Sequence, residues 1–288
     1  MTEPIEPNAS SADVPKESPR AILFQFVVFP LGVVLIGVGV FLLFGRLASE
    51  ERTIRDYVSE VRNGSRHERW QAAYELAKSI KRGEAKQSPN LVLDVIRSFH
   101  AAKEDDPRVR QYLAIVLGKL GDRRATPVLV EAAREPQVET RIYALLALGM
   151  LRDPAAMPQL LASAADPEKD VRKAAIGTLG EMGDPRALPL LVQALEDPAP
   201  DVRYNAAIAL ARMNDRRAAG VLRQMLDRAH YDRVQNMRPD QKEDAILAAI
   251  SAWSQLMGNE GDAELRLLAE SDPSMNVRSA AKTAIAQR

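Results

Sequence analysis

Arginine and aspartate are the residues of this sequence whose types and spacing first suggest chemistry. Arginines recur every 31 residues in four successive segments, at Arg110, Arg141, Arg172 and Arg203. Aspartates recur at the same interval, at Asp122, Asp153, Asp184 and Asp215. A row of guanidinium groups suits carboxylates and other anions, because each group presents several donors in a fixed fork.

A structural role explains this row better than an anion site. In that reading, each arginine bonds loop carbonyls or an aspartate of the adjacent segment and so joins neighbouring segments. Every segment keeps these residues regardless of what its remaining surface carries. Constancy of this kind is what packing between repeated units requires, so we expect a structural ladder.

Other groups that could do chemistry are scattered. The three histidines, His67, His100 and His230, are far apart and lack the i, i+4 pairing of a metal site. The chain has no cysteine, its acidic residues are dispersed, and its serines have no evident base. We therefore expect no catalytic residue, no metal and no cofactor, and a protein that is not an enzyme.

The charges of the chain are balanced. Its 288 residues include 39 basic and 39 acidic side chains, which give a net charge near zero. A protein that mainly neutralises phosphates would carry an excess of Lys and Arg. Nucleic-acid binding is therefore only a lesser alternative.

The 31-residue interval extends to apolar positions, which defines the architecture. Three further columns keep the same step: Leu117, Leu148, Leu179 and Leu210; Ala125, Ala156, Ala187 and Ala218; Leu129, Leu160, Leu191 and Leu222. A fixed period of this length is typical of a solenoid, in which each unit packs only on its neighbours.

Each unit reads as two helices. Around Arg172, Asp166 is expected to cap a helix that Pro167 enters, with apolar residues at three- and four-residue steps up to Gly183. We call this the arginine helix. Asp184 is then expected to cap the second helix of the unit. The sequence thus predicts an all-α solenoid of stacked helical hairpins.

Two strings carry a family resemblance: DVRKAAIGTLGEMGDPRALPLLVQAL (170–195) and PRVRQYLAIVLGKLGDRRATPVLVEAA (107–133). They resemble HEAT repeats of the short class known from the phycocyanobilin lyases, over roughly residues 65–288. The resemblance implies a superhelical stack whose second helices line the concave surface. It implies little about function, because one scaffold serves many functions.

The array is less regular at its ends. We expect an irregular cap unit over 65–103, regular units over 104–227 and C-terminal units over 242–288. Between the last two lies an inserted loop at 230–241, where the interval grows by about 12 residues. Terminal units of a solenoid are expected to be atypical because they cap the stack.

The N-terminal segments differ in composition from the repeats. Residues 1–20 are rich in Pro, Ser and Glu and are expected to be a disordered tail. Residues 21–44 form an uncharged apolar run, long enough for a single transmembrane helix. Residues 45–64 read as a charged helical connector. We therefore expect a single-pass protein of the cell membrane.

The flanking charges favour one orientation. Lys16 and Arg20 precede the apolar run, whereas four arginines follow it before residue 65: Arg46, Arg52, Arg55 and Arg62. Basic residues collect on the cytoplasmic side of membrane helices. The solenoid is accordingly expected on the cytoplasmic side.

Partner contacts are expected in columns that vary between units. On the second helices, two such columns share one face and give the candidates Val128, Gln159, Leu190 and Val221, with Glu131, Gln193 and Gln224. The inserted loop adds Tyr231 and Arg233, because loops tend to carry contacts. Part-apolar residues with a polar rim suit a peptide or helix, although ordinary surface scatter is the alternative.

These features predict a non-catalytic scaffold that recruits or assembles a membrane-associated protein partner through the solenoid. The alternative is a bilin-lyase-like or other accessory and chaperone role, which the family resemblance suggests. A stable subunit and an assembly factor of a larger complex are both compatible with this sequence.

Overall fold

A computed structural model describes residues 28–48, 52–81, 89–104, 106–234 and 237–287. The chain divides into two compact units, Met1–Arg52 and Thr53–Arg288. Every regular element in the described ranges is an α-helix or a 3-10 helix, and no strand occurs there. The predicted all-α class is confirmed.

Helix α2 (Phe29–Ala48) contains most of the apolar N-terminal run. Its described apolar side chains are exposed, from Val40 at 47 % to Phe41 at 76 %. Among the residues that the structure describes, no helix is long and apolar enough to span a bilayer. The transmembrane helix expected over 21–44 is therefore not supported, and residues 21–27, like the tail expected over 1–20, lie outside the described part.

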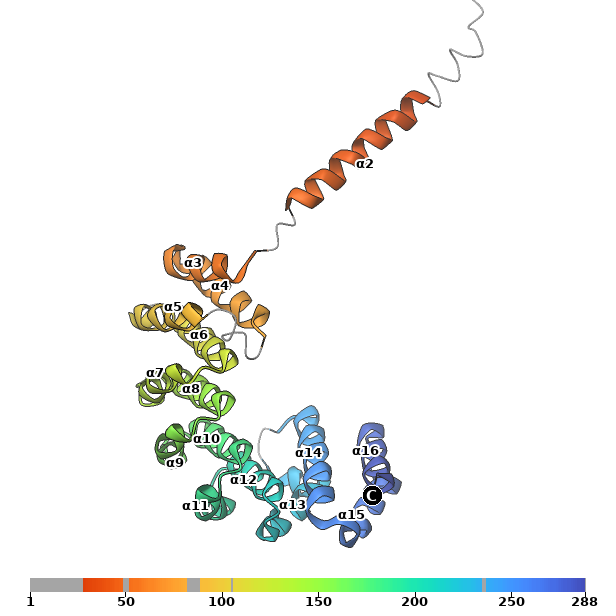
Figure 1. Cartoon of the computed structure of the whole chain (residues 1–288). Coiled ribbons are helices and arrows are strands. Elements are labelled where there is room, and N and C mark those ends of the chain that lie inside the picture. The colour runs from red at the N-terminus through yellow and green to blue at the C-terminus, as the bar shows by residue number, and fades with distance from the viewer. Residues whose placement is uncertain (1–27, 49–51, 82–88, 105, 235–236, 288) are drawn as a thin grey trace, which may run out of the picture. The chain divides into compact units, whose positions relative to one another are not determined.

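The second unit is a two-layered stack of helices (Figure 1). One layer, which we call the inner layer, contains α4 (Arg66–Ser79), α6 (Pro107–Leu120), α8 (Val138–Leu151), α10 (Lys169–Met182), α12 (Pro200–Arg212), α14 (Pro239–Met257) and α16 (Met275–Ala286). The outer layer contains α3 (Ile54–Asn63), α5 (Pro89–Ala101), α7 (Thr126–Ala132), α9 (Met157–Ser163), α11 (Leu188–Gln193), α13 (Ala219–Leu226) and α15 (Asp262–Ser271). Each inner helix packs on the inner helices before and after it.

The arginine helices form this inner layer, which reverses one expectation. In Figure 1 the stack curves so that α6, α8, α10, α12 and α14 lie on the inside of the bend, and the second helices lie outside it. The placement of the second helices on the concave surface is therefore wrong. A period reveals that two helices alternate, but both have an apolar face, so it does not reveal which layer is inside.

The core lies between the two layers. All four members of the leucine column, Leu117, Leu148, Leu179 and Leu210, are fully buried. Inner helices approach one another closely at glycines: a Cβ on Gly118 would lie 2.9 Å from Cα of Ala147, and a Cβ on Gly149 would lie 2.9 Å from Cγ2 of Thr178. The repeated apolar columns are therefore packing positions, as predicted.

One of the two predicted helix caps is confirmed, and one helix begins later than predicted. Asp184 accepts a hydrogen bond from the backbone N–H of Arg186 and caps a 3-10 turn (Pro185–Ala187) that leads into α11. Helix α10 begins at Lys169 and not directly after Asp166 as expected. The reason is a local turn, since the Asp166 carboxylate accepts from the N–H of Glu168 at 2.9 Å.

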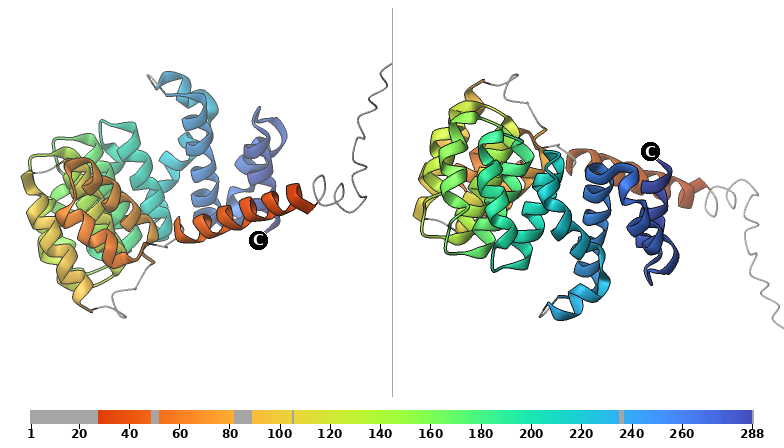
Figure 2. Two further views of the ribbon diagram at one scale, coloured as in Figure 1. Left: turned by 90° about the horizontal axis from the view of Figure 1, so that it is seen from above. Right: turned by 90° about the horizontal axis from the view of Figure 1, so that it is seen from below.

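The insertion is partly helical. Residues Arg228–Arg233 form a 3-10 helix (η9), and α14 already begins at Pro239, so the loop expected over 230–241 is shorter than predicted. The stack changes direction after α12 (Figure 1), and Figure 2 shows α14 and α16 to one side of the earlier helices. Residues 235–236 lie outside the described part.

Candidate protein-binding surface

The arginine ladder joins three segments at each regular step. Nη1 of Arg172 donates to the carbonyl oxygens of Asp166 and Pro167 at 2.9 and 3.0 Å. Its Nε and Nη2 donate to the two carboxylate oxygens of Asp197 at 2.9 and 3.0 Å. One guanidinium thereby fixes the preceding turn and the corresponding turn of the next unit.

Arg141 repeats this arrangement, whereas Arg110 keeps the carboxylate pair but bonds a different carbonyl, that of Phe99. Arg141 bonds the carbonyl oxygens of Glu135 and Pro136 at 2.9 Å each and pairs with Asp166 at 3.1 Å. Arg110 pairs with Glu135 and stacks on the ring of Phe99 at 4.1 Å. Burial lowers the pKa of Arg110, and the nearby Glu135 opposes this effect. The ladder is thus built into the scaffold.

The aspartate column is separate from the arginine ladder. Asp184 forms a forked pair with Arg186, two residues later, and these hydrogen bonds lower the pKa of Asp184 to about 2. Asp122 and Asp215 form the same pair with the arginine two residues after each. Asp153 is buried and accepts from Oγ1 of Thr126 at 2.7 Å. Asp122, Asp184 and Asp215 therefore shape turns within their own units, whereas Asp153 also contacts the preceding unit.

The seven candidates on the second helices all lie in the outer layer, and they differ in exposure. Two are buried, Val128 and Gln159; two are partly buried, Leu190 and Val221; three are exposed, Glu131, Gln193 and Gln224. The amide of Gln159 donates to Oγ of Ser163 at 3.0 Å and accepts from Nε of Arg134. One of the two columns is therefore partly core, and only the other presents free surface.

Tyr231 does not lie in an exposed loop as expected. Its ring is fully buried, its hydroxyl donates to the carbonyl of Met225 at 2.8 Å, and it packs edge to face on Tyr204 and His230. Burial raises the pKa of the Tyr231 hydroxyl. The inserted segment thus contributes to the core, and the side chain of Arg233 lies outside the described part.

The inner face carries exposed apolar side chains, which the sequence interpretation did not select. We give the name inner stripe to two exposed residues, Tyr74 and Leu146, together with three partly buried ones, Tyr112, Ile115 and Tyr143, which also pack against the core. Tyr74 and Leu146 are each 41 % exposed, and the rings of Tyr74 and Tyr112 meet at 5.2 Å. The stripe lies on α4, α6 and α8, which are three successive helices of the inner layer.

An acidic row borders the next part of the inner face. Glu139, Asp170 and Asp201 are exposed and occupy the first turns of α8, α10 and α12. The helix dipole stabilises carboxylates in the first turn of a helix, and this alone explains why acidic residues occur at these positions. Lys173 lies between two of the three, 3.8 Å from Asp170 and 4.0 Å from Asp201. The row nevertheless gives this edge a negative potential.

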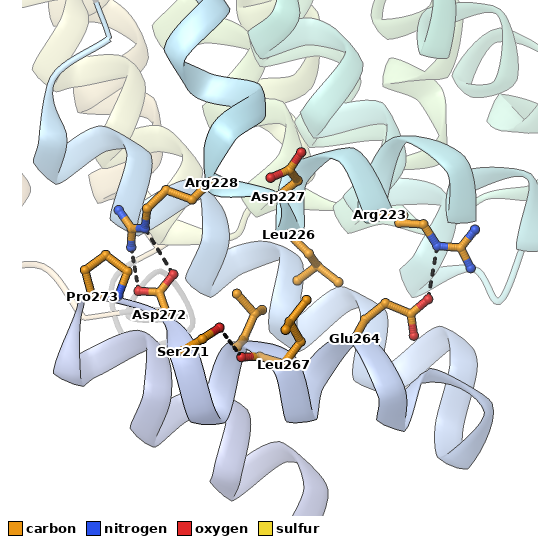
Figure 3. Close-up of a pocket in the computed structure, with 10 residues that line it drawn as sticks. Arg223, Leu226, Asp227, Arg228, Glu264, Leu267, Ser271, Asp272 and Pro273 are labelled. Carbon is orange, nitrogen blue, oxygen red and sulfur yellow. Dashed lines mark hydrogen bonds and ion pairs between the residues drawn. The ribbon is translucent and has the colours of Figure 1, made fainter.

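A pocket of about 320 Å³ lies between α13 and α15 in the outer layer. Figure 3 shows leucines, including Leu226 and Leu267, between two ion pairs that close its ends. Arg223 pairs with Glu264 at 3.0 Å at one end, and Arg228 with Asp272 at 2.8 Å at the other. Since its charged groups are paired with one another, the pocket offers few polar groups to a ligand.

Within the described ranges, no group of three or more His, Asp or Glu side chains could hold a metal ion. His230 is engaged with the hydroxyl of Tyr204 at 2.9 Å, and His67 with the indole of Trp70 at 3.3 Å. Neither arrangement pairs a nucleophile with a base that a third group orients.

Comparison with known proteins agrees with this architecture. A family model described as HEAT repeats matches residues 99–174 and 157–238. The chain is similar to the complex of CpcE and CpcF of phycocyanin lyase from Nostoc sp. PCC7120, at 23 % identity and TM-score 0.53, over 82 % of this chain and 96 % of that chain. It is also similar to YibA of E. coli, at 19 % identity and TM-score 0.50, over 81 % and 82 %.

No curated protein matches the chain by sequence. At these identities the solved structures show the fold alone, and the predicted HEAT-like solenoid is confirmed. The inner stripe was within reach of the sequence, because Tyr112 and Tyr143 belong to one variable column. The sequence did not reveal that the helices carrying these tyrosines form the inner layer.

Proposed function

We propose that this protein is a non-catalytic scaffold that binds another protein on the inner face of its solenoid. The observation that carries the proposal is the inner stripe, in which exposed and partly exposed apolar side chains occupy three successive inner helices, α4, α6 and α8. The two exposed members, Tyr74 and Leu146, are each 41 % exposed, whereas the leucine column that packs between the layers is fully buried. Contiguous apolar patches on a protein surface are typical of interaction sites.

The chemistry of the face indicates the kind of partner. Tyrosines supply rigid apolar area together with a polar tip, which suits protein contacts. The acidic row of Glu139, Asp170 and Asp201 follows the stripe along the stack. A partner segment with apolar side chains next to basic ones complements both features, in a helix-in-groove or extended arrangement. A preformed face binds such a segment with little ordering cost on its own side.

The test compares one inner and one outer position. Leu146→Asp places a charge within the stripe, and Gln193→Asp places the same charge on the exposed outer layer. Partners that co-purify with the wild-type chain from its own cells are identified and their affinities measured with purified variants. We expect at least about tenfold weaker binding for Leu146→Asp and little change for Gln193→Asp. Equal affinities of both variants would contradict the proposal.

Anchoring of this scaffold at the cytoplasmic face of a membrane stays a prediction from residues 21–44. Its support is the length of the uncharged run and the excess of arginine after it. Alkaline carbonate extraction of membranes tests it, since an integral protein stays in the pellet. Release of the chain into the supernatant would remove this part of the proposal.

A second candidate is an accessory role of the kind that the phycocyanin lyase similarity suggests. The observation in its favour is the common fold, which extends over 96 % of that chain. A shift in the absorption spectrum of a free bilin on mixing with the purified protein would favour this candidate. The scaffold could be a stable subunit or an assembly factor of a larger complex. The presence of this chain in the mature, purified complex would identify it as a stable subunit, and its absence there as an assembly factor.

A further inference from the structure

The arginine ladder has a regular acceptor at three of its four positions. Arg110, Arg141 and Arg172 each pair with a carboxylate supplied 25 residues later along the chain. These carboxylates belong to Glu135, Asp166 and Asp197, respectively. Each lies in the turn that leads to the next inner helix.

The fourth arginine keeps the carbonyl bonds of the ladder. Nη1 of Arg203 donates to the carbonyl oxygens of Asp197 and Pro198 at 2.7 and 3.2 Å. Arg172 makes the same two bonds to the carbonyls six and five residues before it, at 2.9 and 3.0 Å. The two guanidinium groups are therefore held in the same way, with the Nε and Nη2 edge pointing away from these carbonyls.

The acceptor of the fourth position is missing, because the residue 25 positions after Arg203 is Arg228. Arg228 reaches forward instead and donates to both carboxylate oxygens of Asp272, at 3.0 and 2.8 Å (Figure 3). That carboxylate is almost fully buried and also accepts from the N–H of Ser274 at 2.8 Å. It is consequently not available to Arg203.

Two other carboxylates in the turns of this region have partners other than Arg203. The carboxylate of Asp197 is taken by Arg172 through two bonds. The carboxylate of Asp227 caps η9 by accepting from the N–H of Ala229 at 3.0 Å. Within the described chain, the side chain of Arg203 bonds only these two carbonyls. Its Nε and Nη2 make no hydrogen bond there, and they are not fully buried. Arg203 as a whole is partly exposed.

We propose that the Nε and Nη2 edge of Arg203 is a binding site for a carboxylate supplied from outside this chain. The chemistry is given by the ladder itself, since the equivalent edge of Arg172 holds a carboxylate through two parallel bonds. The carbonyl bonds fix the guanidinium before the ligand arrives, so little side-chain entropy remains to be lost. Arg228 stands at the position that carries an acidic residue in the three earlier steps, so this position supplies no carboxylate to Arg203.

The carboxylate has two possible sources, an acidic segment of a protein or a small free carboxylate. The site is distinct from the inner stripe and does not depend on it, because Arg203 points to the turns that link the layers. If the inner stripe proved not to bind a protein, carboxylate binding at Arg203 would be unaffected. The reverse also holds.

The experiment follows arginine side chains by NMR in the full-length protein labelled with ¹⁵N-arginine. The Nε–H signals of Arg203 and Arg172 are assigned from the spectra of Arg203→Lys and Arg172→Lys. Sodium acetate is then added, with sodium chloride at equal ionic strength as the control. We expect a saturable shift of the Arg203 signal and none of the Arg172 signal, whose Nε already donates to Asp197.

A peptide of six glutamates distinguishes the two sources. Saturation at a concentration at least about tenfold below that of acetate identifies an acidic protein segment as the ligand class. Equal concentrations, counted per carboxylate, identify a small carboxylate. If the Arg203 signal moves no further in acetate than in chloride, the proposal is overturned.

A double variant provides a matched control. Arg228→Asp supplies the missing acceptor 25 residues after Arg203, and Asp272→Asn removes the charge that Arg228 otherwise neutralises. The Arg203 signal of this variant is expected to resemble that of Arg172 and to lose its response to acetate by at least about tenfold in affinity. If the double variant folds and its Arg203 signal still shifts in acetate as in the wild type, the site is contradicted. If the variant does not fold, the acetate titration of the wild-type protein decides the proposal.

Discussion

Arg172 and Asp197 join two successive repeats through two parallel hydrogen bonds of 2.9 and 3.0 Å. The same guanidinium also bonds the carbonyl oxygens of Asp166 and Pro167. Only 14 % of the arginine side chain and 11 % of the aspartate side chain are exposed. A planar fork makes these four bonds at once, which the single ammonium group of lysine cannot do.

Arg172→Lys is therefore expected to lower the free energy of unfolding by about 1–3 kcal/mol, because buried acceptors lose their donors. Arg186→Lys is the matched control. Arg186 also forms a forked pair, but with Asp184 in its own turn, and its side chain is 57 % exposed. Surface pairs of this kind contribute little. Urea denaturation followed by circular dichroism measures both, and equal losses would contradict the structural role of the ladder.

Two glycines of α10 are expected to respond in opposite directions. A Cβ on Gly180 would collide with Cβ of Ala209 and lie 2.8 Å from its Cα. Gly180→Val should accordingly cost about 1–3 kcal/mol or more, since α12 must move. A Cβ on Gly177 would meet only Oδ1 of Asn205 at an ordinary 3.6 Å. Gly177→Ala should stabilise the helix by up to about 1 kcal/mol.

Thermal unfolding of the two glycine variants is the measurement. The close contact between neighbouring inner helices would be refuted if Gly180→Val melted at the wild-type temperature. Destabilisation by Gly177→Ala would show that the inner face of α10 is more crowded than its contacts indicate.

The alkaline stability of the solenoid is expected to depend on Tyr231. Its burial raises the pKa of the phenol in the folded state above the unfolded value of about 10. A raised folded pKa gives a stabilising contribution that is complete below the unfolded pKa and is lost as the pH rises towards the folded pKa. The free energy of unfolding should therefore fall above about pH 10.

Tyr231→Phe removes the ionisable group and the hydrogen bond to the carbonyl of Met225. Near neutral pH the variant should lose about 1–3 kcal/mol, because the buried carbonyl loses its donor. Its further loss above pH 10 should be smaller than that of the wild type. Parallel alkaline losses in the two proteins would assign the effect to other groups.

The repeated features of this fold were predictable, and the exceptions were not. The 31-residue interval identified the ladder around Arg172 and the cap at Asp184, because each unit repeats the same local chemistry. The pair between Arg228 and Asp272 spans 44 residues and so falls outside that interval. Tyr231 was misjudged for the same reason, since an inserted segment can refill the core with its own side chains.

The candidate site depended on which layer lies inside the bend. Leu190 and Tyr143 both belong to columns that vary between units, and both are partly exposed. Only the three-dimensional curvature distinguishes the outer position of the first from the inner position of the second (Figure 1). A sequence period contains no direction of bending, so it could not decide between them.

Photocrosslinking from one inner and one outer position tests the central claim most directly. A photoreactive amino acid is placed at Leu146 in the inner stripe, and separately at Gln193 on the outer layer, in full-length protein within its own cells. We expect a discrete crosslinked protein from Leu146 that is weak or absent from Gln193. A discrete product from Gln193, with none from Leu146, would contradict binding on the inner face.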